Sequence, residues 1–270
     1  MTGRSLFGIR LWRLLSARRP DFHTSTEAMT ADLARRAAVP RAELAAIVKG
    51  TAPNPDVLHK LGPALNIHVA DLFVIAGLPV PPELASAWPT TPWNVGTIIR
   101  YAMALSPQRR GRLNDAIRSL PIEPRTEPTA DDGFPDEPGA LLIRLMRNRN
   151  IRPNAWLLAQ VGDGPYVSHS TVGMLGRGRV AVTPQYVTAF AHLLGYAPTD
   201  MVALTGVGPV YEQANPHPAS AELAALAWNA RRLTGAQLAH LVHLLEDTRR
   251  LRPSTFDGGQ DGQRDSTGPG

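Results

Sequence analysis

Apolar residues recur at helical spacing along most of the chain, beginning near its first residue. Phe7, Leu11, Leu14 and Leu15 fall at positions i, i+4, i+7 and i+8, and arginines occupy the opposite face. This spacing predicts an amphipathic α-helix. We expect its apolar face to pack into a core; a helix lying on a membrane surface would show the same pattern and is the alternative. Arginines inside the apolar stretch argue against a secretory signal peptide.

Residues 30–78 predict four more short helices joined by tight turns. The pattern is interrupted at Val39–Pro40, Gly50–Pro55 and Asn66–His68. We expect Thr30 to cap the first of these helices, Pro40 to begin the second and Gly50 to end it. The apolar side chains expected to face the core are Leu33, Ala37, Leu44, Ile47, Leu58, Leu61, Leu65, Leu72 and Phe73.

The first two of these four helices form a close pair. A turn of three or four residues makes them cross tightly, which requires small side chains such as Ala34 and Ala38 at the crossing. The second helix of the pair then presents one face to solvent. The residues on that face are Arg41, Ala42, Glu43, Ala46 and Lys49.

Residues 139–206 repeat this plan. A first helix begins there with Leu142, Leu145 and Met146 inward, and with Arg144, Arg147 and Arg149 exposed. Leu158–Ala159 matches Leu33–Ala34 at an offset of 125 residues, but from Val167 onward the offset is 128. The second copy therefore carries a three-residue insertion within the turn GDGPY, which is able to reorient the helix that follows. The outward residues of that helix are His169, Ser170, Thr171, Met174 and Arg177, with Arg179 just beyond.

Each copy is followed by a helical extension, over residues 79–120 and 207–251. Within them, 105–120 aligns with 233–251 at an offset of 128, and each of these helices starts at an N-cap, Ser106 or Thr234. Each is preceded by an Ala- and Leu-rich segment that contains Trp88 or Trp228. The apolar row Leu238, Leu241, Val242 and Leu245 suits either a homodimer through the 233–251 helix or a seam within one chain.

The distribution of charge separates the two copies. The whole chain carries +5, but residues 1–78 and 139–206 carry +4 each, while residues 121–138 carry −5. The segment 121–138 also has five prolines in eighteen residues, which predicts an extended, flexible linker. Residues 252–270 lack apolar periodicity and are expected to be disordered. The sequence thus predicts an all-α protein with domains at 1–78 and 139–206, each with its extension.

The spaced positions of the first copy resemble the Cro/lambda-repressor type of helix-turn-helix, the XRE family of bacterial transcriptional regulators. The positions that carry the resemblance are Leu33–Ala34, Val39, Leu44, Ile47, Lys49–Gly50, Pro55, Leu58, Leu61, Leu65, Ile67, Leu72–Phe73 and Ala76–Gly77. The resemblance implies a five-helix domain whose third helix enters the DNA major groove. The family often has Gln at the start of the second helix, whereas Thr30 stands there in this chain.

This resemblance turns the outward residues into candidate DNA contacts. Arginine reads guanine, glutamate accepts from cytosine, and lysine contacts phosphate in such interfaces. The candidates of the first copy are Thr30, Arg41, Ala42, Glu43, Ala46, Lys49 and Thr51. Those of the second are His169, Ser170, Thr171, Met174, Arg177 and Arg179. The second copy is either another DNA reader or a degenerate copy kept for packing or ligand sensing.

No arrangement of residues points to catalysis, a cofactor or a metal. The chain has no cysteine, which excludes disulfides, thiolate metal ligands and a thiol nucleophile and is compatible with the cytoplasm, where we expect the protein. His240, His243 and Glu246 line one helix face but lack a fourth ligand, so a solvated surface is favoured. No apolar stretch is long enough to span a bilayer.

The sequence therefore predicts a non-enzymatic, sequence-specific regulator of transcription, such as a repressor, whose partner is double-stranded DNA. The alternative is a protein-interaction adaptor, antitoxin-like or an anti-regulator, in which DNA reading is secondary. The alanines at positions 42 and 46 and the inserted turn favour this alternative, because they weaken the two outward faces as DNA readers.

Overall fold

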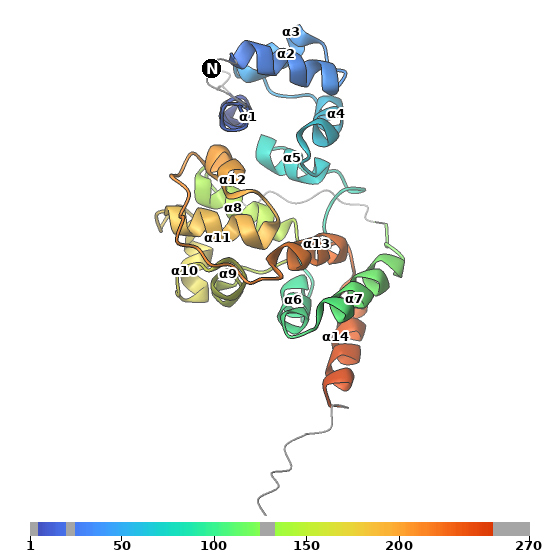
Figure 1. Cartoon of the computed structure of the whole chain (residues 1–270). Helices are drawn as coiled ribbons and strands as arrows, with labels where there is room; N and C mark the ends of the chain where they lie inside the picture. The colour runs from blue at the N-terminus through green and yellow to red at the C-terminus, as the bar shows by residue number, and fades with distance from the viewer. Residues whose placement is uncertain (1–4, 20–24, 125–132, 251–270) are drawn as a thin grey trace, which may run out of the picture.

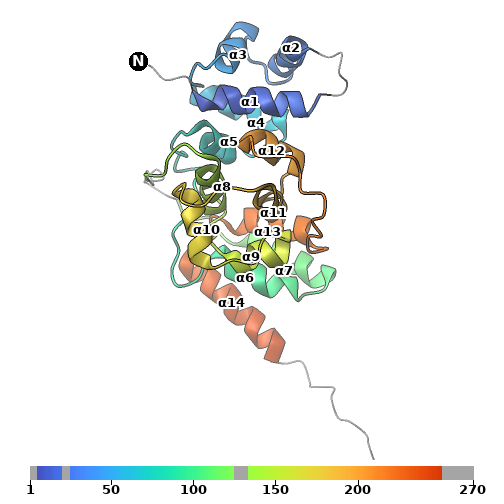
Figure 2. The same cartoon turned by 90° about the vertical axis from the view of Figure 1, so that its left-hand side faces the viewer.

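A computed structural model describes residues 5–19, 25–124 and 133–250 of the chain (Figures 1 and 2). These residues form helices and no strand, which confirms the predicted all-α class. The helices of the first half are α1 (Leu6–Ala17), α2 (Thr26–Arg36), α3 (Arg41–Val48), α4 (Pro55–Leu65), α5 (Val69–Ala76), α6 (Val95–Met103) and α7 (Pro107–Ser119). Those of the second half are α8 (Pro138–Arg147), α9 (Ala155–Gly162), α10 (His169–Gly176), α11 (Pro184–Leu194), α12 (Pro198–Thr205), α13 (Ser220–Ala230) and α14 (Gly235–Arg250).

The N-terminal helix α1 is part of the core. Phe7, Leu11, Leu14 and Leu15 are all buried, as its apolar spacing predicts. Other elements of the chain cover this face, since α1 packs against α2, α3 and α5 and also against α12 of the second half. The helical spacing alone could not distinguish this arrangement from a helix on a membrane surface.

The start of α2 differs from the prediction. Ser25 is the N-cap, and its side-chain oxygen accepts a hydrogen bond from the backbone N–H of Ala28 at 3.1 Å. The predicted cap, Thr30, lies one turn inside the helix, where it is buried and donates to the carbonyl oxygen of Thr26. The polar residues of 25–27 have no apolar periodicity, so the sequence pattern could not locate this first turn.

The two five-helix units, α1–α5 and α8–α12, correspond element by element. Gly8 of α1 and Gly139 of α8 show this most directly, because each lies against the backbone of the third helix of its own unit. A Cβ atom on Gly8 would overlap the carbonyl oxygen of Ile47, and one on Gly139 would overlap that of Leu175. The first helices therefore correspond at an offset of 131 residues, so an offset of 125 is wrong for them.

The inserted turn between α9 and α10 leaves this register unchanged. Asp163 adopts a left-handed conformation (φ 58°) at the end of α9, and its carboxylate accepts a hydrogen bond from the backbone N–H of Asn215 at 2.8 Å. The turn is thus held by the segment before α13, and its two glycines, Gly162 and Gly164, lie close to Ala189 of α11. Because Gly139 contacts α10 as Gly8 contacts α3, the insertion does not shift α10 along α8.

The two helical extensions pack on each other within the chain. Helix α13 contacts both α6 and α7, and α14 contacts α6. Leu238, Leu241 and Val242 of α14 are buried in this seam. The intramolecular alternative therefore accounts for these three members of the predicted row, Leu245 is only partly buried, and the homodimer through residues 233–251 stays a prediction.

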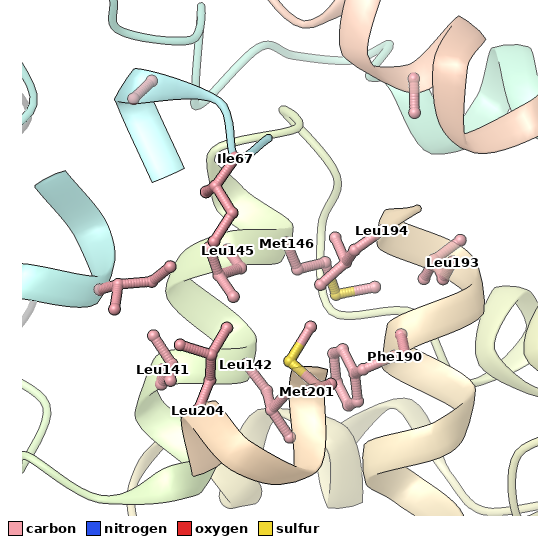
Figure 3. Packing of buried hydrophobic residues seen from close by; sticks show 14 of the residues in the cluster. Ile67, Leu141, Leu142, Leu145, Met146, Phe190, Leu193, Leu194, Met201 and Leu204 are labelled. Carbon is pink, nitrogen blue, oxygen red and sulfur yellow. The ribbon is translucent and has the colours of Figure 1, made fainter. Parts of the chain in front are cut away.

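A single hydrophobic core runs through both halves. Figure 3 shows Ile67, from the turn between α4 and α5, pointing toward Leu145 of α8. Both described ends of the predicted linker are also held: the carbonyl oxygen of Pro121 accepts from Gln237, and that of Phe134 accepts from Arg144. Residues 125–132 of the linker and the predicted tail, 252–270, lie outside the described residues.

Candidate nucleic-acid interface

Helix α3 presents the face that the sequence predicts. Leu44 and Ile47 are buried on its inner side, which fixes the rotation of the helix. Five of the remaining candidates, Arg41, Ala42, Glu43, Lys49 and Thr51, are exposed, and Ala46 is partly exposed. Their side chains carry both signs of charge and short apolar groups, the combination that reads base edges and phosphates.

Thr30 is the one candidate of the first unit that the structure removes from this surface. Only 6% of the residue is exposed, and its hydroxyl is already used within α2. The exposed start of α2 is formed instead by Ser25 and Glu27. The first turn of a helix has free backbone N–H groups, which are able to bind phosphate. Ser25, at the start of α2, therefore takes the position that was expected for Thr30.

Helix α10 presents the corresponding face of the second unit. Ser168 caps it, accepting from the backbone N–H of Thr171 at 3.2 Å, and its hydroxyl lies 2.7 Å from that of Ser170. These bonds gather several hydroxyls at the start of the helix. All predicted residues reach solvent: His169, Ser170, Arg177 and Arg179 are exposed, and Thr171 and Met174 are partly exposed.

Next to α10 lies an exposed aromatic residue, Tyr166, which was not among the residues predicted from the sequence. Tyr166, in the inserted turn, is 92% exposed, which is unusual for a large ring. Trp156 on the first turn of α9 is also exposed. The insertion itself was the available signal, because three extra residues in a tight turn must project from the surface.

The two outward helices lie in different halves of the molecule, α3 near the top of both views and α10 below the middle (Figures 1 and 2). In Figure 2, α3 lies to the left of α2, and α10 lies to the left of α9. Helices α1, α5, α12 and α8 stand between α3 and α10 in both views (Figures 1 and 2). The separation of the two outward helices is therefore set by the junction of the five-helix units.

Two arginine–aspartate clamps hold this junction. Arg18, after α1, donates through Nε and Nη2 to both carboxylate oxygens of Asp200 in α12, at 2.9 and 2.6 Å. Arg149, after α8, donates through Nη1 and Nη2 to both carboxylate oxygens of Asp71 in α5, at 2.6 and 2.7 Å. Each clamp thus joins the first helix of one unit to the last helix of the other.

The clamp between Arg149 and Asp71 is fully buried and has further partners. Asn148 and Tyr196 donate to the two oxygens of Asp71 at 2.7 and 2.8 Å. Burial alone would raise the pKa of Asp71, but the charge and hydrogen bonds of Arg149 outweigh it and hold this pKa below its ordinary value. The expectation that Arg149 is exposed is wrong, because its side chain is 1% exposed. A lone arginine at a helix end gives no sequence signal of a partner 78 residues away.

Aromatic stacking continues the cluster around Arg149. The ring of His68 stacks on Trp228 with centroids 3.4 Å apart, and the guanidinium groups of Arg231 and Arg149 lie 4.0 and 4.5 Å from the centre of that indole. Partial burial of His68, together with these two cations, lowers its pKa to about 4, although Asp71 opposes the shift. Burial and the neighbouring Arg149 lower the pKa of Arg231 to about 9.

The low pKa of His68 predicts a pH-dependent stability. Between about pH 6.5 and pH 4 the unfolded chain binds a proton at this residue and the folded chain does not, so stability falls as the pH falls through this window. Thermal unfolding of the wild type and of His68→Gln, measured from pH 7.5 to 4.5, should show a larger loss for the wild type. His240→Gln, on the exposed face of α14, controls for the number of histidines. Parallel losses in the wild type and His68→Gln would contradict the prediction.

The described residues contain no group of three or more His, Asp or Glu side chains placed to hold a metal. Within the same part of the chain, no helix is long and apolar enough to cross a membrane. Comparison with family models, with curated proteins and with solved structures found no match for this chain.

Proposed function

We propose that this protein binds DNA sequence-specifically and regulates transcription, as the resemblance to XRE-type regulators implies. The observation that carries the proposal is the pair of helices α3 and α10. Each is held by a corresponding five-helix unit, each exposes polar and cationic side chains, and each lies to the left of the helix that precedes it in Figure 2. Such a helix fits the major groove, where base edges are distinguishable.

The exposed residues of α3 have distinct roles in this proposal. Arg41, at the first position of the helix, donates two hydrogen bonds to guanine, and Glu43 accepts one from cytosine. Ala42 and Ala46 contact thymine methyl groups. Lys49 and Thr51, at the far end, contact phosphate, which positions the helix without reading sequence.

Helix α10 contacts DNA in a different way from α3, because the exposed residues of the two helices differ. The hydroxyl groups of Ser170 and Thr171 contact base edges or phosphate at the start of the helix. His169 and Met174 add contacts along the groove, and Arg177 and Arg179 follow its end. The charge of +4 on each of residues 1–78 and 139–206 supports this proposal, since the DNA backbone is anionic.

The test is selection of bound sequences from random DNA by the full chain, followed by affinity measurements at several salt concentrations. We expect a defined sequence preference and an affinity that falls as salt rises. Arg41→Ala should weaken binding to the selected site by about 10- to 100-fold and relax the preference at one base pair. Lys49→Ala should weaken binding to all sequences alike and lower the salt slope.

Arg118→Ala provides the matched control, because Arg118 is exposed on α7, away from both outward helices. It removes the same charge and should leave affinity nearly unchanged. Binding without sequence preference and without a salt slope would overturn the proposed function.

A second candidate function, a protein-interaction adaptor, is favoured by one surface feature. Ile9 and Trp12 lie one turn apart on α1 and are 40% and 46% exposed, so an apolar patch faces solvent beside the junction. If regulation in cells survived Arg41→Ala combined with Arg177→Ala but was lost in Trp12→Ser, the adaptor would replace the DNA reader.

A further inference from the structure

We infer that a single chain is an internal dimer, which binds one DNA duplex at two unlike half-sites in inverted orientation. This inference rests on the proposed function and specifies the DNA that it requires. The observation behind it is the set of contacts between the two halves. Neither the linker nor the repeated sequence pattern reveals these contacts.

The contacts between the five-helix units are reciprocal. Helix α1 packs on α12, and the corresponding helix α8 packs on α5. The extensions repeat the arrangement, since α6 contacts α14 and the corresponding α13 contacts α7. When element i of one copy touches element j of the other and j touches i in return, the two copies are related by a two-fold rotation. A translation between the copies would give a head-to-tail contact with two different surfaces.

The clamps extend this reciprocity to individual residues. Arg18 donates to Asp200 and also, through Nη1, to the carbonyl oxygen of Leu65 at 2.6 Å. Arg149 donates to Asp71 and also, at 3.3 Å, to the carbonyl oxygen of Leu194. The carbonyl acceptors end corresponding helices, α4 and α11, of the arginine's own unit. The aspartates occupy the third position of α5 and of α12, in the other unit, so the offset is 129 for these helices and the predicted 128 is wrong there.

A two-fold relation fixes the relative direction of the two half-sites. Two equal readers related by rotation about an axis perpendicular to the duplex meet the two strands in opposite senses, as repressor dimers do. In Figure 2, α3 lies above the junction and α10 below it, and we place the duplex along the left of this view, where α3 lies to the left of α2 and α10 to the left of α9. The half-sites must then be separated by whole helical turns of about 10 bp.

The half-sites are inverted in orientation but unlike in sequence. The exposed start of α3 reads Arg41, Ala42, Glu43, whereas that of α10 reads His169, Ser170, Thr171. A homodimer presents two identical helices and therefore favours a palindrome. This chain presents two different ones at fixed positions, so its preferred site has a defined left and right half.

One chain is sufficient for this binding, because the contacts that relate the two halves are made within it. Both clamps close within the chain, and three residues of the apolar row of α14 are buried within it. We therefore expect one chain for each duplex.

The experiment uses the full chain and the DNA selected from random sequence. We expect two different motifs in inverted orientation, and sedimentation of the complex should give one chain per duplex. Inserting either 5 bp or 10 bp between the motifs should lower affinity by about 100-fold or more, because the junction fixes the separation of α3 and α10 and the second intramolecular contact is then lost. Arg41→Ala should relax one motif only, and His169→Ala, at the corresponding position of α10, the other only, whereas Arg177→Ala, at the position of Lys49, should weaken binding to all sequences alike.

The outcomes separate this inference from the proposed function. A direct repeat, a single motif, or two chains on one duplex would overturn the internal dimer and leave sequence-specific binding intact. The absence of any sequence preference would overturn the proposed function itself. Arg41, His169 and Arg177 are exposed and take no part in the junction. None of these substitutions is therefore expected to unfold the chain.

Discussion

Replacing Asp71 by alanine should lower the free energy of unfolding by about 3–5 kcal/mol. The substitution leaves Arg149 buried without its counter-charge, at a site where both side chains are at most 1% exposed, and a buried unpaired charge is strongly destabilising. Asn148 and Tyr196 lose their acceptor at the same time. Urea unfolding at pH 7, followed by circular dichroism, measures the change.

The chain offers a matched control at the second clamp. Arg18 and Asp200 also form a pair with two hydrogen bonds, but their side chains are 31% and 12% exposed, so water solvates the arginine when Asp200→Ala removes its partner. We expect a much smaller loss, of about 1 kcal/mol. The double variant Asp71→Leu with Arg149→Met should recover most of the stability lost in Asp71→Ala, because neither charge of the buried pair is left without its partner. Equal losses in the two single variants would show that burial does not govern the clamps.

Replacing Gly139 by alanine should destabilise the second unit by about 1–3 kcal/mol and abolish sequence preference at the motif read by α10. The added methyl group would overlap the carbonyl carbon and oxygen of Leu175, which are backbone atoms and cannot rotate away. Helix α10 must therefore move from α8. Chemical denaturation measures the stability, and selection of bound DNA measures the lost motif.

Gly111→Ala is the control for this variant. Gly111 lies inside α7, and a methyl group there would meet no atom within 4 Å. Because glycine is a poor helix former, this substitution should stabilise the protein by up to about 1 kcal/mol. A Gly139→Ala variant that behaved like Gly111→Ala would contradict the close packing of α8 and α10. Gly8→Ala should mirror Gly139→Ala in the first unit and affect the motif read by α3.

The local structure of this chain was predictable because it depends on neighbouring residues. Apolar residues three and four positions apart located every helix of the first unit, and Ser106 caps its helix as predicted, accepting from the N–H of Arg109. The outward faces of α3 and α10 followed from the same periodicity, since burying Leu44 and Ile47 leaves only one face free.

The junction was not predictable, because it depends on contacts between residues far apart in the chain. Periodicity assigned Arg149 to the exposed face of its helix, and only the approach of Asp71 makes its burial possible. Ala38 was expected to pack at the crossing of α2 and α3, but it is exposed in a left-handed conformation (φ 50°), while Ala34 is buried there. Composition does not reveal which of several alanines near a turn is buried at the helix crossing.

Holding both halves in one chain also changes how DNA occupancy would depend on the concentration of the protein. A regulator that assembles from two chains loses its paired form on dilution, so its occupancy of DNA rises steeply with concentration. In this chain the two halves are covalently continuous, and dilution does not separate them. Occupancy should therefore follow a simple hyperbola with a Hill coefficient of one. If both halves bind DNA as proposed, the same continuity lets each half change its own outward helix without altering the other.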